Sequence, residues 1–521
     1  MKTTTALLAA ATSPAVLATG TNGSSSSKCK PYVTPEFLQA LVRLEDLLAG
    51  SQTLQDIADA NGGNRAFGGG GHNATVDWLY DTLSATGYFD VVKQPFVELF
   101  SAGSAKLGGS GGETQYKPQI LTYTPGTPDG KALSRPVVAV ANLGCDAADY
   151  PKAEAIKDNI ALVKRGTCDF STKASLAKAA GAAAAIVYNN VEGGVSGTLG
   201  KQSDAHAPIV GISQAEGNAI LSALSSGPLV LDLFIESIIE NRTNYNVIAE
   251  TKQGDKDNVL VLGGHSDSVY AGPGINDDGS GSVGVWAVAK ALTGFRIKNA
   301  VRFAFWGAEE YGKLGSFYYV KQLNKTETEI AKIRAYLNFD MIASPNYVYG
   351  IYDGDGSAFN FSGPAGSDQI ERDFEDFFKA NNLPSVPSVF SGRSDYAGFI
   401  ENGIPSGGLF TGAEVLKTPE EARLFGGEAG APYDANYHQA GDTVANLDHD
   451  AFLVNTKAIA NSVAKYAMSW SSLPAVHLPQ RRWSADRHRA LNNMRSVAGH
   501  GHGHTGAAHA HSGPCGGGSV I

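Results

Sequence analysis

Three apolar runs in the second half of the chain end in residues that can bind a metal ion. VLVLGG is followed by His265 and Asp267, VRFAFWGA by Glu309 and Glu310, and AYLNF by Asp340. Uninterrupted apolar runs that alternate with helical stretches such as DGSGSVGVWAVAKALTGF are typical of parallel strands buried on both faces. The sequence therefore predicts an α/β fold: a three-layer sandwich around a mixed, mostly parallel sheet.

The polar ends of these strands are expected to converge, because ligands of open α/β sheets bind beyond the carboxyl ends of the strands. Asp277 and Asp278 stand in GPGINDDGSG at the start of a predicted helix, and His438 stands in NYHQAGD. Two histidines and three carboxylates can hold two divalent cations that share a bridging aspartate. Chemistry alone accepts either Asp277 or Asp278 as the bridge. Asp267 can accept the second N–H of His265 and fix its tautomer.

Each of these motifs by itself is an ordinary strand end, turn or helix start. Together, the segments GGHSDSV, GPGINDDGSG, FAFWGAEEYGKLGS, LNFDMI and YHQAGD resemble the M28 family of co-catalytic zinc aminopeptidases. The resemblance covers about residues 35–95 and 240–472, and every expected ligand position is filled.

The resemblance implies two Zn²⁺ ions per chain and a role for each residue of the cluster. Asp277 is implied to bridge the ions, and Glu309 to be the general base that activates the bridging water. The other implied ligands are His265 and Asp340 at one ion, and Glu310 and His438 at the other.

Two further residues are candidates for contact with the substrate. Tyr437 matches a tyrosine that stabilises the tetrahedral oxyanion in some family members, with core packing as the alternative. The segment SGRSDYAGF matches a family pattern that often reads Ser-Asp-His, and Tyr396 stands here in place of that histidine. Arg393, in the same segment, is a candidate for substrate binding or for a surface salt bridge.

A segment of different character interrupts the chain. It contains IALVKRGTCDFSTKASLAKAAGAAAAIVYNN, which resembles a protease-associated (PA) domain, and its short strands predict a β-rich module with one or two helices. It carries no catalytic cluster, so we expect it to cover the mouth of the site, to limit access for long substrates or to bind a partner. The predicted divisions are a signal peptide (1–18), the N-terminal part of the catalytic domain (19–117), the PA insertion (118–238), the main catalytic domain (239–473) and a disordered His/Gly/Arg-rich tail (474–521).

The ends of the chain predict a secreted (extracellular) or vacuolar protein. MKTTTALLAAATSPAVLA combines a positive residue, an apolar stretch and small residues, as a secretory signal peptide does. No later apolar run reaches the roughly 20 residues of a membrane span. The tail holds an AGHGHGH tract, which can bind metal or be dispensable. Sequons for N-glycosylation occur at Asn22, Asn73, Asn241, Asn324 and Asn360.

Four cysteines in 521 residues are too few for a disulfide-built scaffold. Cys145 and Cys168 bracket a compact stretch and are a candidate disulfide, worth about 3 kcal/mol by the chain-entropy estimate, with two buried thiols as the alternative. The net charge of -10 disfavours a nucleic-acid-binding surface. We expect a monomer without a nucleic-acid partner.

The expected activity is removal of N-terminal residues, hydrophobic and Leu-type or broad, from peptides with a free N-terminus. A carboxypeptidase of the same fold needs clustered cationic residues for the substrate carboxylate, and the motif loops show little besides Arg393. A glutaminyl cyclase shares the fold but uses one zinc, which the complete ligand set argues against. A receptor-like relative without activity would have lost ligands.

Overall fold

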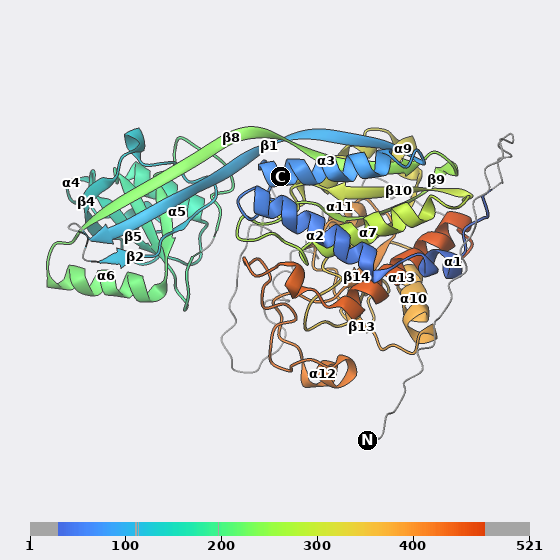
Figure 1. Cartoon of the computed structure of the whole chain (residues 1–521). Coiled ribbons are helices and arrows are strands. Elements are labelled where there is room, and N and C mark those ends of the chain that lie inside the picture. The colour runs from blue at the N-terminus through green and yellow to red at the C-terminus, as the bar shows by residue number, and fades with distance from the viewer. Residues whose placement is uncertain (1–29, 110–111, 113, 196, 475–521) are drawn as a thin grey trace, which may run out of the picture.

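The computed structural model describes residues 30–474 apart from 110–111, 113 and 196. The body of the molecule is built on a sheet with the strand order β13-β12-β14-β11-β9-β10-β8 (Figure 1). Strands β9, β10, β11 and β14 are parallel, whereas β12 is antiparallel to β14 and β8 to β10. The predicted mixed, mostly parallel sheet is confirmed. Its shorter strands are β9 (Asp255–His265), β10 (Asn299–Trp306), β11 (Ile333–Phe339), β12 (Gly350–Tyr352), β13 (Val386–Ser388) and β14 (Ser406–Phe410).

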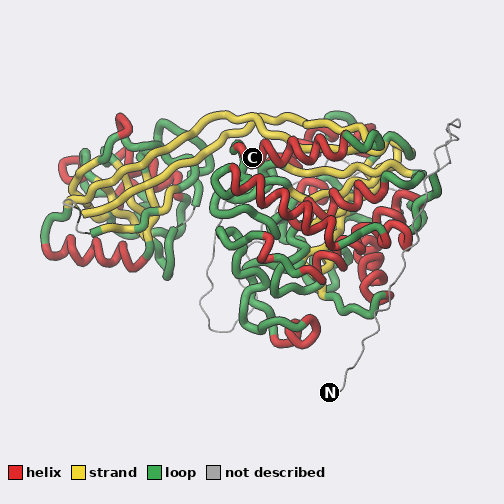
Figure 2. Tube along the Cα trace, viewed as in Figure 1, coloured by secondary structure: helices red, strands yellow, loops and turns green. Residues whose placement is uncertain are grey.

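Side chains of β9 alternate between two buried clusters, one on each face of the sheet. Leu260 and Leu262 join one cluster, and Val259 and Val261 join the other, as the two-residue repeat of a strand requires. Helices therefore cover both faces (Figure 2), and the predicted three-layer sandwich is confirmed. The first face is covered by α1 (Pro35–Ala40), α2 (Leu44–Ala60), α3 (Gly70–Ser84), α7 (Gly279–Leu292), α10 (Ser367–Ala380) and α13 (His449–Met468), and the second by α8 (Leu314–Leu323), α9 (Glu327–Ala331) and α11 (Tyr396–Glu401).

Two long strands, β1 (Phe89–Gly109) and β8 (Val230–Thr251), form an antiparallel ribbon that links the body to a second unit (Figure 1). The ribbon is paired from Phe89 opposite Thr251 to Gly109 opposite Leu231. One end of β8 pairs with β10 of the body, and the other pairs with β4 of the second unit. The predicted limits of the insertion, 118 and 238, fall after the end of β1 and inside β8.

The second unit has a parallel sheet of its own, in the order β4-β5-β6-β7, with a buried cluster on each face. A separate core of this kind is the mark of a domain. A disulfide joins Cys145 and Cys168, whose Cα atoms are 5.7 Å apart, as predicted. The elements of the unit are β2 (Gln115–Tyr116), β3 (Gln119–Ile120), β4 (Leu133–Ala139), β5 (Ile160–Lys164), β6 (Ala184–Tyr188), β7 (Ile209–Ile212), α4 (Ala153–Ile156), α5 (Phe170–Ala179) and α6 (Gln214–Ser226).

The parallel strands of the body end on the side where the second unit lies. Strand β8 enters the body from the second unit, and β10 runs antiparallel to it, so the Trp306 end of β10 points back toward that unit. Because β9, β11 and β14 are parallel to β10 through their neighbours, their carboxyl ends share this edge. Residues that follow these strands therefore face the second unit.

Within the described part of the chain, no helix combines the length and apolar character needed to cross a membrane. The sequon asparagines at 73, 241, 324 and 360 are all exposed, and glycosylation there stays a prediction. The predicted signal peptide, Asn22 and the tail beyond Pro474 lie outside the described residues.

Candidate dinuclear metal centre

The structure brings the five predicted ligands together at the carboxyl edge of the sheet. Oδ1 of Asp277 is 3.1 Å from Nε2 of His265, and Oδ2 of Asp277 is 3.1 Å from Nε2 of His438. Oδ1 of Asp340 lies 3.8 Å from Nε2 of His265, and Oε2 of Glu310 lies 3.0 Å from Nε2 of His438. The cluster is therefore two groups, each of one histidine and two carboxylates, that share Asp277.

The neighbouring carboxylate of Asp278 binds backbone N–H groups instead of facing the two histidines. It accepts hydrogen bonds from the backbone N–H groups of His265, Gly281 and Met341, at 2.9 to 3.0 Å. These bonds fix the start of α7 against the ends of β9 and β11. The geometry thus favours Asp277 over Asp278 as the residue that two ions can share.

The fold delivers each ligand from a different element. His265 is the last residue of β9, Asp340 follows the last residue of β11, and Glu310 follows β10 after a short turn. Asp277 precedes α7, and His438 comes from the long connection between β14 and α13. Residues that are up to 173 positions apart in the sequence, His265 and His438, therefore lie in one cluster.

Three non-glycine residues in this region have a left-handed backbone. The φ angles are 58° at Ala308, 55° at Met341 and 58° at His438. Ala308 directly precedes Glu309, and Met341 directly follows Asp340. L-residues adopt such angles at a cost, so the surrounding structure must hold them there, a pattern that clusters at functional sites.

Buried carboxyl groups crowd around the cluster, and burial makes each of them harder to ionise. Burial raises the pKa of Asp267 to about 7 and that of Asp340 to about 7. Burial by itself would lower the pKa of His265, but Asp277 and Asp340 outweigh it and hold that pKa well above its usual value. A buried, electron-rich set of imidazole nitrogens and carboxylate oxygens matches the donor preference of zinc and similar divalent ions.

Asp267 supports the cluster differently from the prediction. Nδ1 of His265 lies 3.2 Å from the backbone carbonyl oxygen of Asp267 and 3.7 Å from its carboxylate. The carboxylate instead accepts a hydrogen bond from the backbone N–H of Glu309 at 3.0 Å. Asp267 therefore orients the imidazole through its backbone and Glu309 through its side chain.

Two residues that the sequence reasoning missed also hold ligands. Oγ of Ser394 donates to Oδ2 of Asp340 at 2.5 Å. The Asp442 carboxylate accepts from the backbone N–H groups of Asn276 and Asp277, at 2.8 and 3.0 Å. Their only signal in the sequence is that they stand in SGRSDYAGF and YHQAGD, two segments that carry the family pattern.

Tyr437 and Arg393 lie together at the rim of the cluster. The Tyr437 ring stacks on the His438 imidazole with centroids 3.8 Å apart. Nη2 of Arg393 donates to the Tyr437 hydroxyl at 3.1 Å, and Nη1 forms a 2.7 Å ion pair with Glu414. The buried Tyr396 does not join them, because its hydroxyl accepts a backbone hydrogen bond from Gly392.

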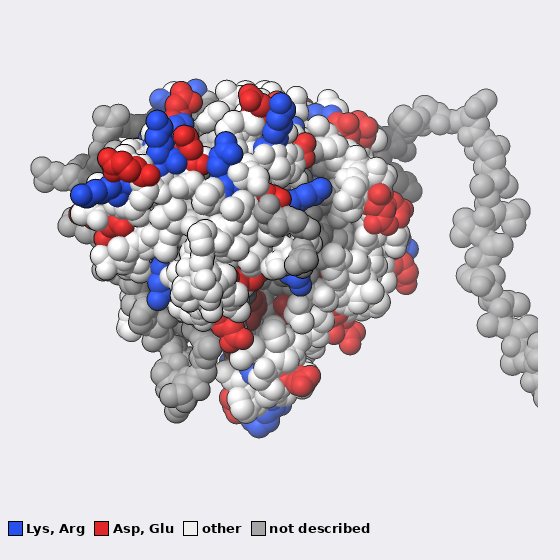
Figure 3. Space-filling model, turned by 90° about the vertical axis from the view of Figure 1, so that its left-hand side faces the viewer, with Lys and Arg blue, Asp and Glu red and all other residues white. Residues whose placement is uncertain are grey.

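Seen from the side of the second unit, acidic side chains lie within a hollow of the surface (Figure 3).

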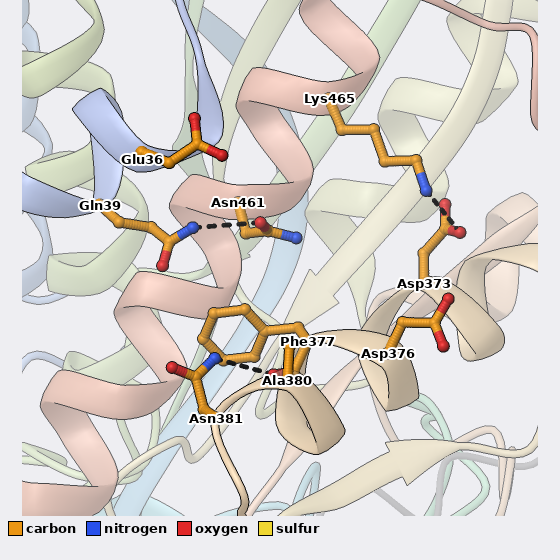
Figure 4. A pocket seen from close by; sticks show the side chains of 9 residues that line it. All are labelled: Glu36, Gln39, Asp373, Asp376, Phe377, Ala380, Asn381, Asn461 and Lys465. Carbon is orange, nitrogen blue, oxygen red and sulfur yellow. Dashed lines mark hydrogen bonds and ion pairs between the residues drawn. The ribbon is translucent and has the colours of Figure 1, made fainter.

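A separate polar pocket lies between α1, α10 and α13, where Lys465 forms an ion pair with Asp373 (Figure 4). None of the residues that line this pocket belongs to the ligand cluster. The lining residues are Glu36, Gln39, Asp373, Asp376, Phe377, Ala380, Asn381, Asn461 and Lys465.

The sequence matches two family models. Residues 246–463 match peptidase family M28, and residues 133–220 match the PA domain. The probable leucine aminopeptidase 2 of Aspergillus fumigatus is 55% identical over 449 residues, which are 85% of this chain and 88% of that protein. Leucine aminopeptidase 2 of Trichophyton rubrum is 52% identical over 446 residues, with the same coverage.

Solved structures show a similar fold. An aminopeptidase from Aneurinibacillus sp. strain AM-1 superposes with a TM-score of 0.64 at 23% identity, over 86% of this chain and 99% of that one. BSAP, a zinc aminopeptidase from Bacillus subtilis, gives a TM-score of 0.65 at 23% identity, over 84% and 98%.

Proposed function

Because the chain belongs to peptidase family M28 and carries a PA domain, we propose that it removes N-terminal residues from peptides by means of two zinc ions. Membership of this family makes the chain a peptidase hydrolase. The free N-terminus, the paired zinc ions and a preference for hydrophobic residues, Leu-type or broad, are parts of the proposal. The name of the relatives, leucine aminopeptidase 2, supports the N-terminal specificity and the side-chain preference.

One observation carries the proposal: the two oxygens of Asp277 face two different histidines at the same distance, 3.1 Å. A carboxylate placed in this way suits a bridge between two cations. His265 and Asp340 would hold one ion, and Glu310 and His438 the other. When bound, paired ions of this kind polarise a carbonyl group and make water a stronger nucleophile.

The protein residues supply proton transfer and charge stabilisation. Glu309, buried and held by Asp267 at its backbone N–H, would take a proton from the attacking water and pass it to the leaving amine. The Tyr437 hydroxyl, oriented by Arg393, would donate a hydrogen bond to the oxyanion of the tetrahedral intermediate. Tyr437 stacks on His438, and this contact fixes the position of its ring.

The proposal extends to the setting of the enzyme. We propose a monomer that is secreted or vacuolar, on the strength of the predicted signal peptide, the sequons and the disulfide. The carboxyl edge of the sheet faces the PA domain, which supports a role of that domain in limiting access for long substrates.

The test is a panel of aminoacyl-4-nitroanilides, assayed with and without a chelator and with zinc added back. We expect cleavage of free-amine substrates, none of N-acetylated ones, and loss of activity on chelation. Glu309→Gln should keep the zinc content and lose turnover. Metal binding without aminoacyl cleavage would move the search to C-terminal substrates or cyclisation, and a protein that binds no metal would contradict the ligand assignment.

A further inference from the structure

Arg65 is fully buried beside the ligand cluster, in the loop between α2 and α3. Its guanidinium donates to three backbone carbonyls: Nη1 to Ser266 at 2.5 Å, Nη2 to Gly274 at 2.6 Å and Nε to Pro273 at 2.9 Å. The backbone of Arg65 also pairs with Ser268, whose Oγ accepts from the Arg65 N–H and whose N–H donates to the Arg65 carbonyl. All three guanidinium nitrogens therefore donate hydrogen bonds to the same loop.

The three carbonyls lie at the two ends of the loop that joins two ligands. Ser266 directly follows His265, and Gly274 stands three residues before Asp277. One planar guanidinium therefore ties the chain after the first ligand to the chain before the second. Its N–H groups point in fixed directions, so it sets the relative position of the carbonyls more rigidly than an ammonium group does.

The loop leaves little freedom around this contact. Gly274 has a φ of +63°, and a Cβ there would lie 2.4 Å from the Asp277 carbonyl oxygen and 3.3 Å from Nη2 of Arg65. The Asp442 carboxylate accepts a hydrogen bond from the backbone N–H of Asp277. The backbone that leads to Asp277 is therefore held at two points, the Gly274 carbonyl by Arg65 and the Asp277 N–H by Asp442.

We propose that Arg65 is a positioning residue: by joining the carbonyls of Ser266, Pro273 and Gly274, it sets the spacing between His265 and Asp277 and so the affinity of the cluster for its ions. This inference rests on the proposed two-zinc function. It concerns a part of the chain that lies outside the M28 match at 246–463. Its positive charge alone would repel cations, so the contribution to metal binding comes from geometry.

The test compares Arg65→Ala and Arg65→Lys with a matched control, Arg302→Ala. Arg302 is also mostly buried, with 16% of its side chain exposed, but it pairs with Glu250 and Tyr319 instead of with the loop. The readouts are the zinc dissociation constant, from competition with a chromogenic chelator, and the melting temperature of the metal-free protein. We expect Arg65→Ala to raise the zinc dissociation constant about tenfold or more, and Arg302→Ala to lower the melting temperature with zinc affinity unchanged.

Two further comparisons separate geometry from charge and from stability. Arg65→Lys keeps the positive charge but lacks the planar guanidinium with its fixed N–H directions, so the zinc affinity of this variant should also fall. About 20 mM guanidinium chloride, too little to denature the protein, should restore zinc affinity to Arg65→Ala by filling the vacated site, and should leave Arg302→Ala unaffected.

The inference is overturned if Arg65→Ala binds zinc as the wild type does while losing as much stability as Arg302→Ala. If Arg65→Ala does not fold, wild-type zinc affinity in Arg65→Lys overturns it equally. Failure of the proposed function looks different: the wild type would bind zinc and cleave no aminoacyl substrate, and the role of Arg65 would then be judged on zinc affinity alone. A wild-type protein that binds no zinc would contradict both the proposed function and the role of Arg65.

Discussion

The carboxylates of the cluster differ in how the protein holds them, and this should make the two proposed ion sites separable by mutation. Asp340 receives a hydrogen bond from the Ser394 hydroxyl, which itself accepts one from Asn338 at 2.8 Å. Asp277 is instead held through its backbone by Asp442. Loss of the Ser394 hydroxyl should therefore disturb one ion far more than the other.

For Ser394→Ala we predict that one of two bound zinc ions is weakened about 10- to 100-fold, the usual range for lost support of a ligand. The other ion should keep its affinity. Stepwise zinc titration of the metal-free protein measures both constants. Ser391→Ala, in the same segment but without contact to a ligand, is the control, and equal weakening of both ions would contradict the prediction.

Tyr437→Phe tests the oxyanion role. The change removes the hydroxyl and keeps the ring stacked on His438. We predict a fall in kcat of about 100-fold with little change in KM, as for other lost oxyanion donors. Steady-state kinetics on leucyl-4-nitroanilide measures this split. Arg393→Met should give a smaller loss of kcat, and a change confined to KM in Tyr437→Phe would assign the hydroxyl to ground-state binding instead.

At this scale the sequence predicts which candidate ligands converge, but not the residues that support them. Histidine and carboxylate ligands follow apolar strands in a pattern that metal chemistry explains, and the structure brings all five together. Arg65 and Ser394 carry no such pattern. Arg65 contacts residues about 200 positions away in the chain, and only the folded structure shows which carbonyls it meets.

At the scale of elements, close packing of α7 against the sheet places Asp277 next to the strand ends. Gly281, in the first turn of α7, is the point of contact: a Cβ there would lie 2.0 Å from the Phe339 carbonyl oxygen and 2.4 Å from Oδ1 of Asp278. Phe339 and Asp278 each stand next to a candidate ligand in the chain, so a shift of the helix at this point should also shift the cluster.

We therefore predict that Gly281→Ala lowers stability by about 1–3 kcal/mol through overpacking and weakens zinc binding as well. Gly294→Ala is the matched control, because a Cβ there would meet only the Ala291 carbonyl oxygen at 3.8 Å. Urea unfolding and zinc titration of both variants give the comparison. Normal zinc affinity in Gly281→Ala would show that the first turn of α7 adjusts independently of the ligands.

Elements with a clear periodicity could be predicted, and elements shaped by tertiary pairing could not. The apolar runs of β9, β10 and β11 identify buried strands because both of their faces lie against helices. The ribbon of β1 and β8 mixes exposed and buried positions, since its middle lies between two domains, and its sequence has no simple alternation. Only the pairing of the two strands with each other explains their length.

At the scale of the whole molecule, a rise in pH should act in opposite directions on the stability of the metal-free protein and on its affinity for zinc. Asp267 and Asp340, with pKa values raised to about 7, bind protons in the folded protein that the unfolded chain releases near pH 4. Stability that depends on these protons is present at low pH and is lost as pH rises through about 7. Zinc binds to deprotonated carboxylates, so the affinity for zinc should rise with pH.

We predict that the metal-free protein melts at a lower temperature at pH 8 than at pH 5.5, and that added zinc raises the melting temperature more at pH 8. Thermal melts with chelator and with zinc, at constant ionic strength, measure both effects. The same melts on Asp267→Asn should show a flatter pH response without metal. A metal-free protein that becomes more stable from pH 5.5 to pH 8 would contradict the assignment.

The orientation of the PA domain leads to a prediction about substrate length. The ligand cluster follows strands whose carboxyl ends point toward that domain, which the ribbon of β1 and β8 joins to the body. A long substrate chain leaving the site on this side has to pass the domain, whereas a dipeptide does not. Access should therefore depend on the domain for long peptides alone.

Residues 104–236 can be replaced by Asn-Gly, which joins the paired positions Gly103 and Ser237 as a two-residue hairpin. We predict unchanged kcat/KM for leucyl-4-nitroanilide and a rise in the rate on peptides of about 20 residues, a length that spans roughly 70 Å when extended. The ratio of the two rates in the variant and in the full chain is the measurement. A variant that loses activity on the small substrate while binding zinc normally would show instead that the PA domain completes the site, because no substrate of that size extends far enough to meet a barrier.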